Sequence, residues 1–295
     1  MRNFFCLLFI FLSGTDDSIK EEEPFFEFEI ILDKNGLPDS YKAYIKSPVC
    51  EKDKCYDIEI IMQWDLMGRF REYDTLSGKG LTKLDHIPFT TEDYQKLELL
   101  LEDPNSPIGS YRKEELIRDT RKSELDGFTG ATIKEINDIV VGGGVYSCYT
   151  LWHLANRKFT DSITKMTMGS LEKKLMKKLV NQKDRAIDYF MINNLHPTDF
   201  LNYRDEVLEM IVSHRGYFAK TAIQKMPAEI FEDSITQEFF SKNLTSLNYF
   251  AQVALLKQLN TTPLIPALKN ALISQKEDRN SLKNKLIQDL TITIE

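Results

Sequence analysis

The first part of the chain alternates apolar and polar residues with the period of a half-buried β-strand. Residues 25–32 alternate in this way and end at the turn-forming tetrapeptide Asp33-Lys34-Asn35-Gly36. Three further segments, residues 41–45, 56–64 and 70–73, are rich in β-branched and aromatic residues. The pattern predicts an antiparallel sheet with packed helices, that is, an α+β N-terminal domain.

A helix is predicted after these strands. The tetrapeptide Thr90-Thr91-Glu92-Asp93 supplies an N-cap and first-turn acids, and the apolar residues of segment 94–101 follow helical spacing. An amphipathic helix beside a sheet buries its apolar stripe against that sheet. We therefore expect this helix to cover one face of the strands.

From about residue 160 the apolar positions follow helical spacing without interruption by strands, which predicts an all-α second half. Residues 216–223 are echoed about 32 residues later by residues 248–255, and a fainter copy lies at residues 186–195. A repeat of this length predicts stacked helix pairs that resemble HEAT repeats. An irregular helical bundle is the alternative. The predicted helical domain covers residues 160–295.

The N-terminus has the features of a secretory signal peptide. One positive charge at Arg2 precedes an apolar run over residues 4–12, and small residues follow at Ser13 and Gly14. The run is much shorter than the roughly 20 residues of a membrane-spanning helix. We expect residues 1–14 to be removed, residues 15–23 to form a linker, and the mature protein to be periplasmic or extracellular with no integral membrane segment. Thr15 stands where an acylated cysteine would be, so no lipid anchor is expected.

Export would leave three cysteines, because Cys6 lies in the predicted signal peptide. Cys50 and Cys55 flank a charged, turn-like tetrapeptide, and this spacing predicts a disulfide that closes a hairpin. Cys148 has no predicted partner. The four histidines are scattered and there is no second pair of closely spaced cysteines, so a metal site is not expected.

Charge separates the two halves of the chain. The whole sequence has 45 acidic and 38 basic residues; residues 1–160 contain 29 of the acids and 20 of the bases, so the excess negative charge lies in the first half. No cluster of lysines and arginines occurs of the kind that phosphate backbones require. Nucleic acid is therefore not an expected partner.

One loop carries the strongest candidate chemistry. The heptapeptide Asp126-Gly127-Phe128-Thr129-Gly130-Ala131-Thr132 precedes a helix predicted to begin near Ile133. The small residues Gly130 and Ala131 would let another active site close over the Thr132 hydroxyl, and a helix N-terminus favours an anionic phosphoester. The alternative is that Thr129 or Thr132 only caps the helix.

This heptapeptide resembles the flavinylation motif D-x-x-(S/T)-G-A-(T/S) of the FMN-binding domain family, the extracytoplasmic flavoprotein modules of sodium-pumping NADH:quinone reductase and Rnf complexes. The resemblance implies a covalent phosphodiester between FMN and Thr132, made by an ApbE-type flavin transferase. It also implies that Asp126, Thr129, Gly130 and Ala131 are recognition and positioning residues. It covers the motif closely and residues 24–158 by their layout as an α+β domain.

Other features near the motif suggest further roles. Residues 142–144 are three glycines that could cradle a phosphate, although a hinge between helices suits them better. Tyr149 and Trp152 could stack on a flavin ring. His86 and His153 raise the possibility of a catalytic histidine, with Ser147, Cys148 or Thr150 as nucleophile, but no spacing fixes a triad. Buried, hydrogen-bonded histidines are the expected outcome, and no catalytic residue is assigned.

Two functions follow from the sequence. In the first, the protein is an exported flavoprotein that carries FMN on Thr132 and acts in extracytoplasmic electron transport with an unidentified redox partner, while the helical repeats dock a partner. In the second, it is a non-enzymatic periplasmic or surface interaction protein whose first domain is structural.

Overall fold

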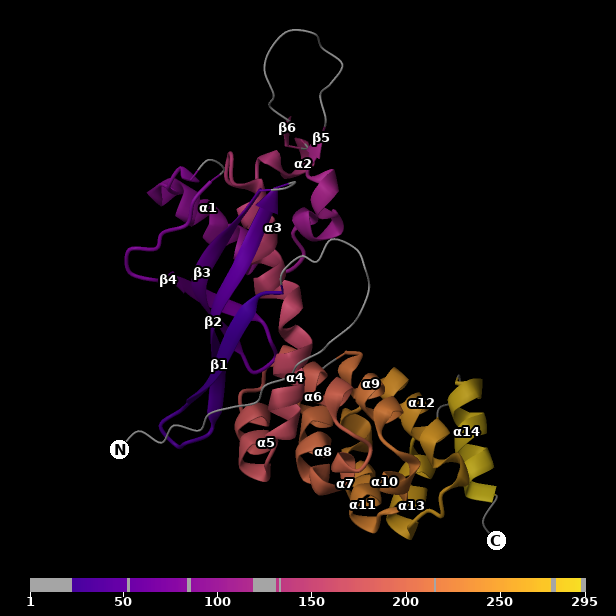
Figure 1. The fold of residues 1–295 in the computed structure, drawn as a ribbon. Helices are drawn as coiled ribbons and strands as arrows, with labels where there is room; N and C mark the ends of the chain where they lie inside the picture. Colours follow the sequence, from indigo (N-terminus) through magenta and orange to yellow (C-terminus); the bar gives the residue numbers. More distant parts are fainter. Residues whose placement is uncertain are drawn as a thin grey trace, which may run out of the picture. The chain divides into compact units, whose positions relative to one another are not determined.

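The protein is described by a computed structural model, and its chain divides into two compact units between Thr167 and Met168 (Figure 1). The residues described are 23–51, 54–83, 86–118, 131–132, 134–214, 216–276 and 280–292. The unit that ends at Thr167 is called the sheet unit, and the unit that begins at Met168 is called the helical unit.

The sheet unit contains a four-stranded antiparallel sheet in the order β1-β2-β3-β4, as the alternation predicts. Its strands are β1 (Phe25–Leu32), β2 (Pro38–Glu51), β3 (Lys54–Asp65) and β4 (Phe70–Thr75). Each strand pairs with the next one along the chain. The sheet is therefore a meander of successive hairpins.

Strand β2 extends further than the sequence suggests. Pro48 lies within it, although proline usually argues against a central strand because it lacks an N–H donor. The pairing of β1 with β2 reaches only from Pro38 to Lys46, so Pro48 lies beyond the end of β1 and is paired with β3 alone, opposite Asp57. The missing donor therefore breaks no pairing between β1 and β2.

The Cys50–Cys55 disulfide joins β2 to β3 near their common hairpin. The two cysteines are directly opposite each other in the register, and their sulfur atoms are bonded. This confirms the predicted pairing. A disulfide is the usual state of paired cysteines in an oxidising compartment, and it is consistent with export.

The core of the sheet unit lies between one face of the sheet and two helices. The inward side chains of β2 and β3 are fully or almost fully buried, among them Tyr41, Ile45, Ile60, Met62 and Trp64. The helices that pack there are α1 (Thr91–Glu102) and α3 (Val145–His153). In α1 the predicted N-terminus is confirmed, since Thr90 and Asp93 form a reciprocal capping box.

Short elements connect α1 to α3 and continue beyond it. They are the 3-10 helices η2 (Pro107–Ser110) and η3 (Lys113–Glu115), the two-residue strands β5 (Ile117–Arg118) and β6 (Ala131–Thr132), the one-turn helix α2 (Lys134–Asn137) and the π-helix η4 (Leu154–Lys158). Helix α4 (Thr160–Gly169) follows. The hydroxyl of Thr167 donates to the Leu66 carbonyl at 2.7 Å and lies 3.0 Å from the Tyr41 hydroxyl, which attaches most of α4 to the sheet unit.

The helical unit is a two-row array of helix pairs. One row consists of α5 (Lys173–Val180), α8 (Arg204–Ser213), α11 (Ser234–Asn243) and α13 (Pro266–Ser274). The other consists of α6 (Arg185–Asn194), α9 (Phe218–Lys225), α12 (Tyr249–Gln258) and α14 (Ser281–Ile292). Each helix contacts the next one in its own row (Figure 1). The short helices α7 (Asp199–Asn202) and α10 (Ala228–Glu232) lie in the connections.

This arrangement accounts for the repeat in the sequence. The second helix of a pair begins at residues 185, 218, 249 and 281, so the pairs recur at intervals of about 32 residues. The two segments that resemble each other belong to α9 and α12, which lie side by side in the same direction. Asn248 donates to the Gly216 carbonyl at their N-terminal ends, and Gln258 donates to the Ile223 carbonyl at 3.2 Å near their C-terminal ends.

No helix within the described ranges combines the length and the apolar character needed to cross a membrane.

Candidate functional site

The structure describes the last two residues of the candidate flavinylation motif. Asp126, Thr129 and Gly130 lie outside the described residues. Ala131 and Thr132 form β6, which pairs antiparallel with β5, so that Thr132 is opposite Ile117 and Ala131 is opposite Arg118. The backbone of Thr132 is thus held by a short hairpin-like pairing in the sheet unit.

A helix follows the motif, as predicted, but it is short. Helix α2 begins at Lys134 and contains four residues. The macrodipole of a helix is the sum of aligned peptide dipoles, so a single turn contributes little positive potential. Helix α2 would therefore stabilise a phosphoester at Thr132 only slightly.

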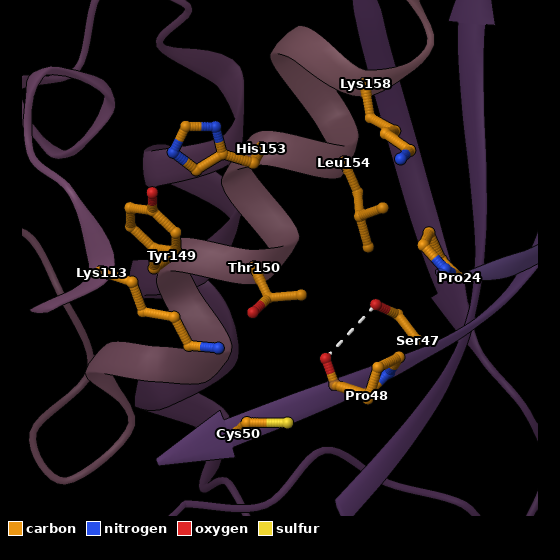
Figure 2. A pocket seen from close by; sticks show the side chains of 10 residues that line it. All are labelled: Pro24, Ser47, Pro48, Cys50, Lys113, Tyr149, Thr150, His153, Leu154 and Lys158. Atoms are coloured by element: carbon orange, nitrogen blue, oxygen red, sulfur yellow. Dashed lines mark hydrogen bonds between the residues drawn. The ribbon is translucent and has the colours of Figure 1, made fainter. Parts of the chain in front are cut away.

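A pocket of about 170 Å³ opens between strand β2 and helix α3 in the same unit (Figure 2). One wall comes from Ser47, Pro48 and Cys50 of β2, and the opposite wall from α3 and η4. The complete lining is Pro24, Ser47, Pro48, Cys50, Lys113, Tyr149, Thr150, His153, Leu154 and Lys158. This volume is below the roughly 300–1,000 Å³ of pockets that enclose a drug-sized ligand. The pocket can accept a phosphate or the edge of a ring, and the remainder of a larger ligand would stay exposed.

The lining of the pocket is basic although the surrounding half of the chain is acidic. Lys113 and Lys158 are both lining residues, and none of the lining residues is a carboxylate. Lys158 forms an ion pair with Glu23, whose side chain is largely exposed. Figure 2 shows the ammonium of Lys113 on the Thr150 side of the pocket, while the Tyr149 ring extends toward His153. This set of groups favours an anionic ligand with an apolar or aromatic part.

His153 is the most unusual polar residue of the lining. Its Nε2 atom is buried and has no hydrogen-bond partner among the described residues. Its ring lies against Tyr149, with 4.2 Å between the centroids, and edge-on to Trp152. Burial, and secondarily the charge of Arg157, lower the pKa of His153, so the imidazole is neutral at pH 7. A neutral, unpaired ring nitrogen is available to hydrogen-bond a ligand.

Helix α3 divides its predicted functional residues between the pocket and the core. Trp152 is fully buried, and its indole N–H donates to the Asp103 carbonyl at 2.8 Å. The backbone of Gly109 lies so close that a Cβ there would be 2.1 Å from the Trp152 ring. The expectation that Trp152 stacks on a flavin is therefore wrong: it is a core residue. Tyr149 lies at the pocket.

Two of the three candidate nucleophiles on α3, Ser147 and Cys148, have structural partners, and the third, Thr150, lines the pocket. The Ser147 hydroxyl is 2.7 Å from the Tyr56 hydroxyl and donates to the Thr82 carbonyl at 3.1 Å. The Cys148 thiol is buried and accepts a hydrogen bond from the Val141 N–H at 3.4 Å. Burial raises the pKa of Cys148 to about 12, so it is not a thiolate at neutral pH. Ser147 and Cys148 thus serve the packing of α3.

The expectation of buried, hydrogen-bonded histidines is wrong for His86 and His153. His86 is exposed, in a left-handed backbone conformation with φ of 60°, and its ring meets the edge of Tyr56. The buried nitrogen of His153 lacks a partner among the described residues, as stated above. In the helical unit, His196 lies in a loop and His214 is the C-cap residue of α8.

The three glycines at residues 142–144 form the turn that leads into α3. Gly143 has φ of +73°, a conformation that favours glycine, and Gly144 is the N-cap residue of α3. This supports the hinge interpretation over a phosphate cradle. Within the part of the chain that the structure describes, no cluster of three or more His, Cys, Asp or Glu residues could hold a metal ion.

The pocket itself was missed by the sequence reasoning, because its walls come from residues about 100 positions apart. One signal was present: Tyr149 and His153 are four residues apart on α3 and therefore share a face. No family model, no curated protein and no solved structure matches this chain.

Proposed function

We propose that this protein is an exported flavoprotein that carries FMN covalently on Thr132 and takes part in extracytoplasmic electron transfer, with the helical unit docking a partner. The observation that carries the proposal is the motif from Asp126 to Thr132, whose fixed positions all agree with the flavinylation motif. The Cys50–Cys55 disulfide is consistent with export.

The position of Thr132 along the chain supports the proposal. Thr132 pairs with Ile117, and Ile117 follows Lys113 of the pocket lining by four residues. Given the reach of an extended chain and the spacing of paired strands, the backbones of Lys113 and Thr132 are within about 20 Å of each other. A mononucleotide on Thr132 and the long side chain of Lys113 can bridge this separation.

The chemistry of the pocket fits part of such a group. The phosphate would be bonded to Thr132, so the flavin ring is the part that reaches the pocket. Lys113 and Lys158 would donate to the carbonyl oxygens of the ring, Tyr149 would cover its edge, and the neutral His153 would donate or accept a hydrogen bond. FMN would supply the redox chemistry, and these residues would orient it and influence its potential. The small volume of the pocket leaves most of the ring exposed, which suits electron exchange with another protein.

The test is to co-express the exported chain with an ApbE-type flavin transferase. We expect in-gel flavin fluorescence after denaturation and the mass increment of FMN on the peptide that contains Thr132. Thr132→Ser keeps the hydroxyl and is expected to be labelled, whereas Thr132→Ala removes it and is expected to abolish labelling. The proposal fails if no covalent flavin forms, or if Thr132→Ala is labelled as strongly as the unchanged chain.

A second candidate function, a non-enzymatic interaction protein, is favoured by the large exposed apolar residues of the helical unit. It shares the docking role and predicts that the chain stays free of flavin under the same conditions.

A further inference from the structure

A cluster of exposed aromatic side chains lies where α9 and α12 begin. Tyr217 precedes α9, while Tyr249 and Phe250 are the first two residues of α12. Their exposed fractions are 60%, 39% and 49%. The Tyr217 and Phe250 rings are 5.2 Å apart between centroids, and the Tyr249 and Phe250 rings are 5.6 Å apart. Three aromatic rings thus form one exposed surface.

The repeat geometry holds this cluster in place. Asn248 caps α12 by accepting from the Ala251 N–H at 3.0 Å, and its side-chain amide also donates to the Gly216 carbonyl beside Tyr217. The two helix starts are therefore tied to each other. A preorganised aromatic surface loses little conformational entropy when it binds, which is the usual property of an interface anchor.

The two helices that carry the cluster contain lysines and no acidic residue. Lys220 lies over the Tyr217 ring, with 5.9 Å between its Nζ and the centroid. Lys225 and Lys257 are exposed at the opposite ends of α9 and α12. The sequence contains no acidic residue from 216 to 228 or from 239 to 276, in a chain where acids outnumber bases by 45 to 38. These two helices therefore present aromatic rings and ammonium groups without a carboxylate.

We propose that the faces of α9 and α12, with Tyr217, Tyr249, Phe250, Lys220 and Lys257, bind an acidic protein segment that carries aromatic or aliphatic anchors. The aromatic rings would supply the apolar contact, and the lysines would pair with carboxylates at the rim of that contact. The inference rests on the docking role proposed for the helical unit and is independent of the flavin. A protein segment is favoured over nucleic acid because three lysines along two helices are too few to follow a phosphate backbone.

The experiment measures fluorescence anisotropy with the full exported chain and three labelled probes. The first probe is a peptide of about 12 residues that repeats Glu-Asp-Phe-Glu-Asp-Leu. The second is its charge-reversed version, with Lys and Arg in place of the acids. The third is an oligothymidine of similar length. We expect the acidic peptide alone to bind below about 1 mM, more weakly as salt increases.

Two sets of variants locate the binding surface. The double variant Tyr217→Ala, Phe250→Ala is expected to weaken binding of the acidic peptide about tenfold or more. Lys220→Glu is expected to weaken it several-fold and keeps the test informative if the double variant folds poorly. Ile235→Ala removes an exposed apolar side chain of α11, and Lys173→Glu reverses an exposed charge of α5; both controls are expected to stay within about twofold.

Several results would overturn the inference. The first is that the acidic peptide does not bind, or that the charge-reversed peptide binds equally well. The second is that the oligothymidine binds more tightly, which would assign the surface to nucleic acid. The third is that the control variants lose as much binding as the variants at Tyr217 and Lys220. In-gel flavin fluorescence of the same preparations reports the flavin separately, so a failure of either proposal is recognised without reference to the other.

Discussion

Each unit buries a titratable group, on His153 in the sheet unit and on Asp188 in the helical unit, but only the one in the helical unit pairs with another titratable side chain. In the sheet unit, the buried Nε2 of His153 has no partner among the described residues. In the helical unit, Asp188 of α6 is buried, and its Oδ2 is paired with Nε2 of His214 at the end of α8. The other carboxylate oxygen, Oδ1, is buried and has no partner within the described residues. The first arrangement leaves a ring nitrogen for a ligand, and the second joins two helices of the array.

Burial opposes charge in both units, but it acts on groups of opposite sign. It lowers the pKa of His153, which is charged when protonated. It raises the pKa of Asp188, which is charged when deprotonated, and this effect outweighs the opposite influence of His214. The two units are therefore expected to respond to pH in opposite directions. Both native tryptophans, Trp64 and Trp152, lie in the sheet unit, so tryptophan fluorescence reports the unfolding of that unit.

The largest effect is expected from Trp152→Ala. This change removes a fully buried ring that fills the space beside Gly109, and with it one of two hydrogen bonds to the Asp103 carbonyl, which also accepts from the Ser106 N–H. It should lower the free energy of unfolding of the sheet unit by about 3–5 kcal/mol. Urea titration followed by the fluorescence of Trp64 measures the loss. Leu99→Ala on the exposed face of α1 is the control and should change stability by less than about 0.5 kcal/mol.

Removing the disulfide should have the next largest effect. The double variant Cys50→Ser, Cys55→Ser frees a loop with a sequence separation of 5, for which loop-closure entropy corresponds to about 2 kcal/mol. The loss should be confined to the transition seen by tryptophan fluorescence. An equal loss in the helical signal at 222 nm would show that the two units unfold together.

Asp188→Asn tests the buried pair of the helical unit. Because the folded pKa of Asp188 is raised above its usual value, the folded state binds this proton more tightly than the unfolded state does. Its contribution to stability is complete below about pH 3.8 and is lost as pH rises through the folded pKa. The amide does not titrate. The free energy of unfolding of the helical unit, followed at 222 nm, should therefore decline less steeply above about pH 4 than in the unchanged chain. A slope identical to that of the unchanged chain would contradict the assignment.

His153→Gln tests the sheet unit and should have the smallest effect. The folded pKa of His153 is lowered, so the unfolded state binds this proton more tightly. The associated stability is complete above about pH 6.5 and is lost as pH falls toward the folded pKa. Glutamine does not titrate, and the tryptophan-detected transition should become less sensitive to pH below about 6.5. We therefore expect the two substitutions to change the slope of unfolding free energy against pH in opposite directions, each in the unit that carries it.

Local patterns in the sequence predicted the elements well. Alternation revealed the four strands, the Thr90 cap revealed the start of α1, and the spacing of Cys50 and Cys55 revealed their disulfide. Each of these signals lies within a few residues of the feature it describes. The part of β2 around Pro48 was not predicted, because a proline is tolerated in a strand only where no neighbouring strand needs its N–H. The sequence does not reveal that β1 ends before this position.

Contacts between distant residues were not predictable in the same way. Trp152 has the residue type of a flavin-stacking side chain, and only its approach to Gly109 and Asp103 makes it a core residue. The pocket depends equally on bringing Ser47 of β2 opposite Thr150 of α3. The flavin on Thr132 stays a prediction, because most of its motif lies outside the described residues.

The parallel stacking of α9 on α12 also bears on how this protein can change in evolution. In an array of this kind, each helix pair depends mainly on the pairs beside it. Gain or loss of a whole pair at the C-terminal end, about 32 residues at a time, would leave the contact between Gly216 and Asn248 intact. The length of the array can therefore vary among descendants while the aromatic cluster of Tyr217, Tyr249 and Phe250 is inherited unchanged.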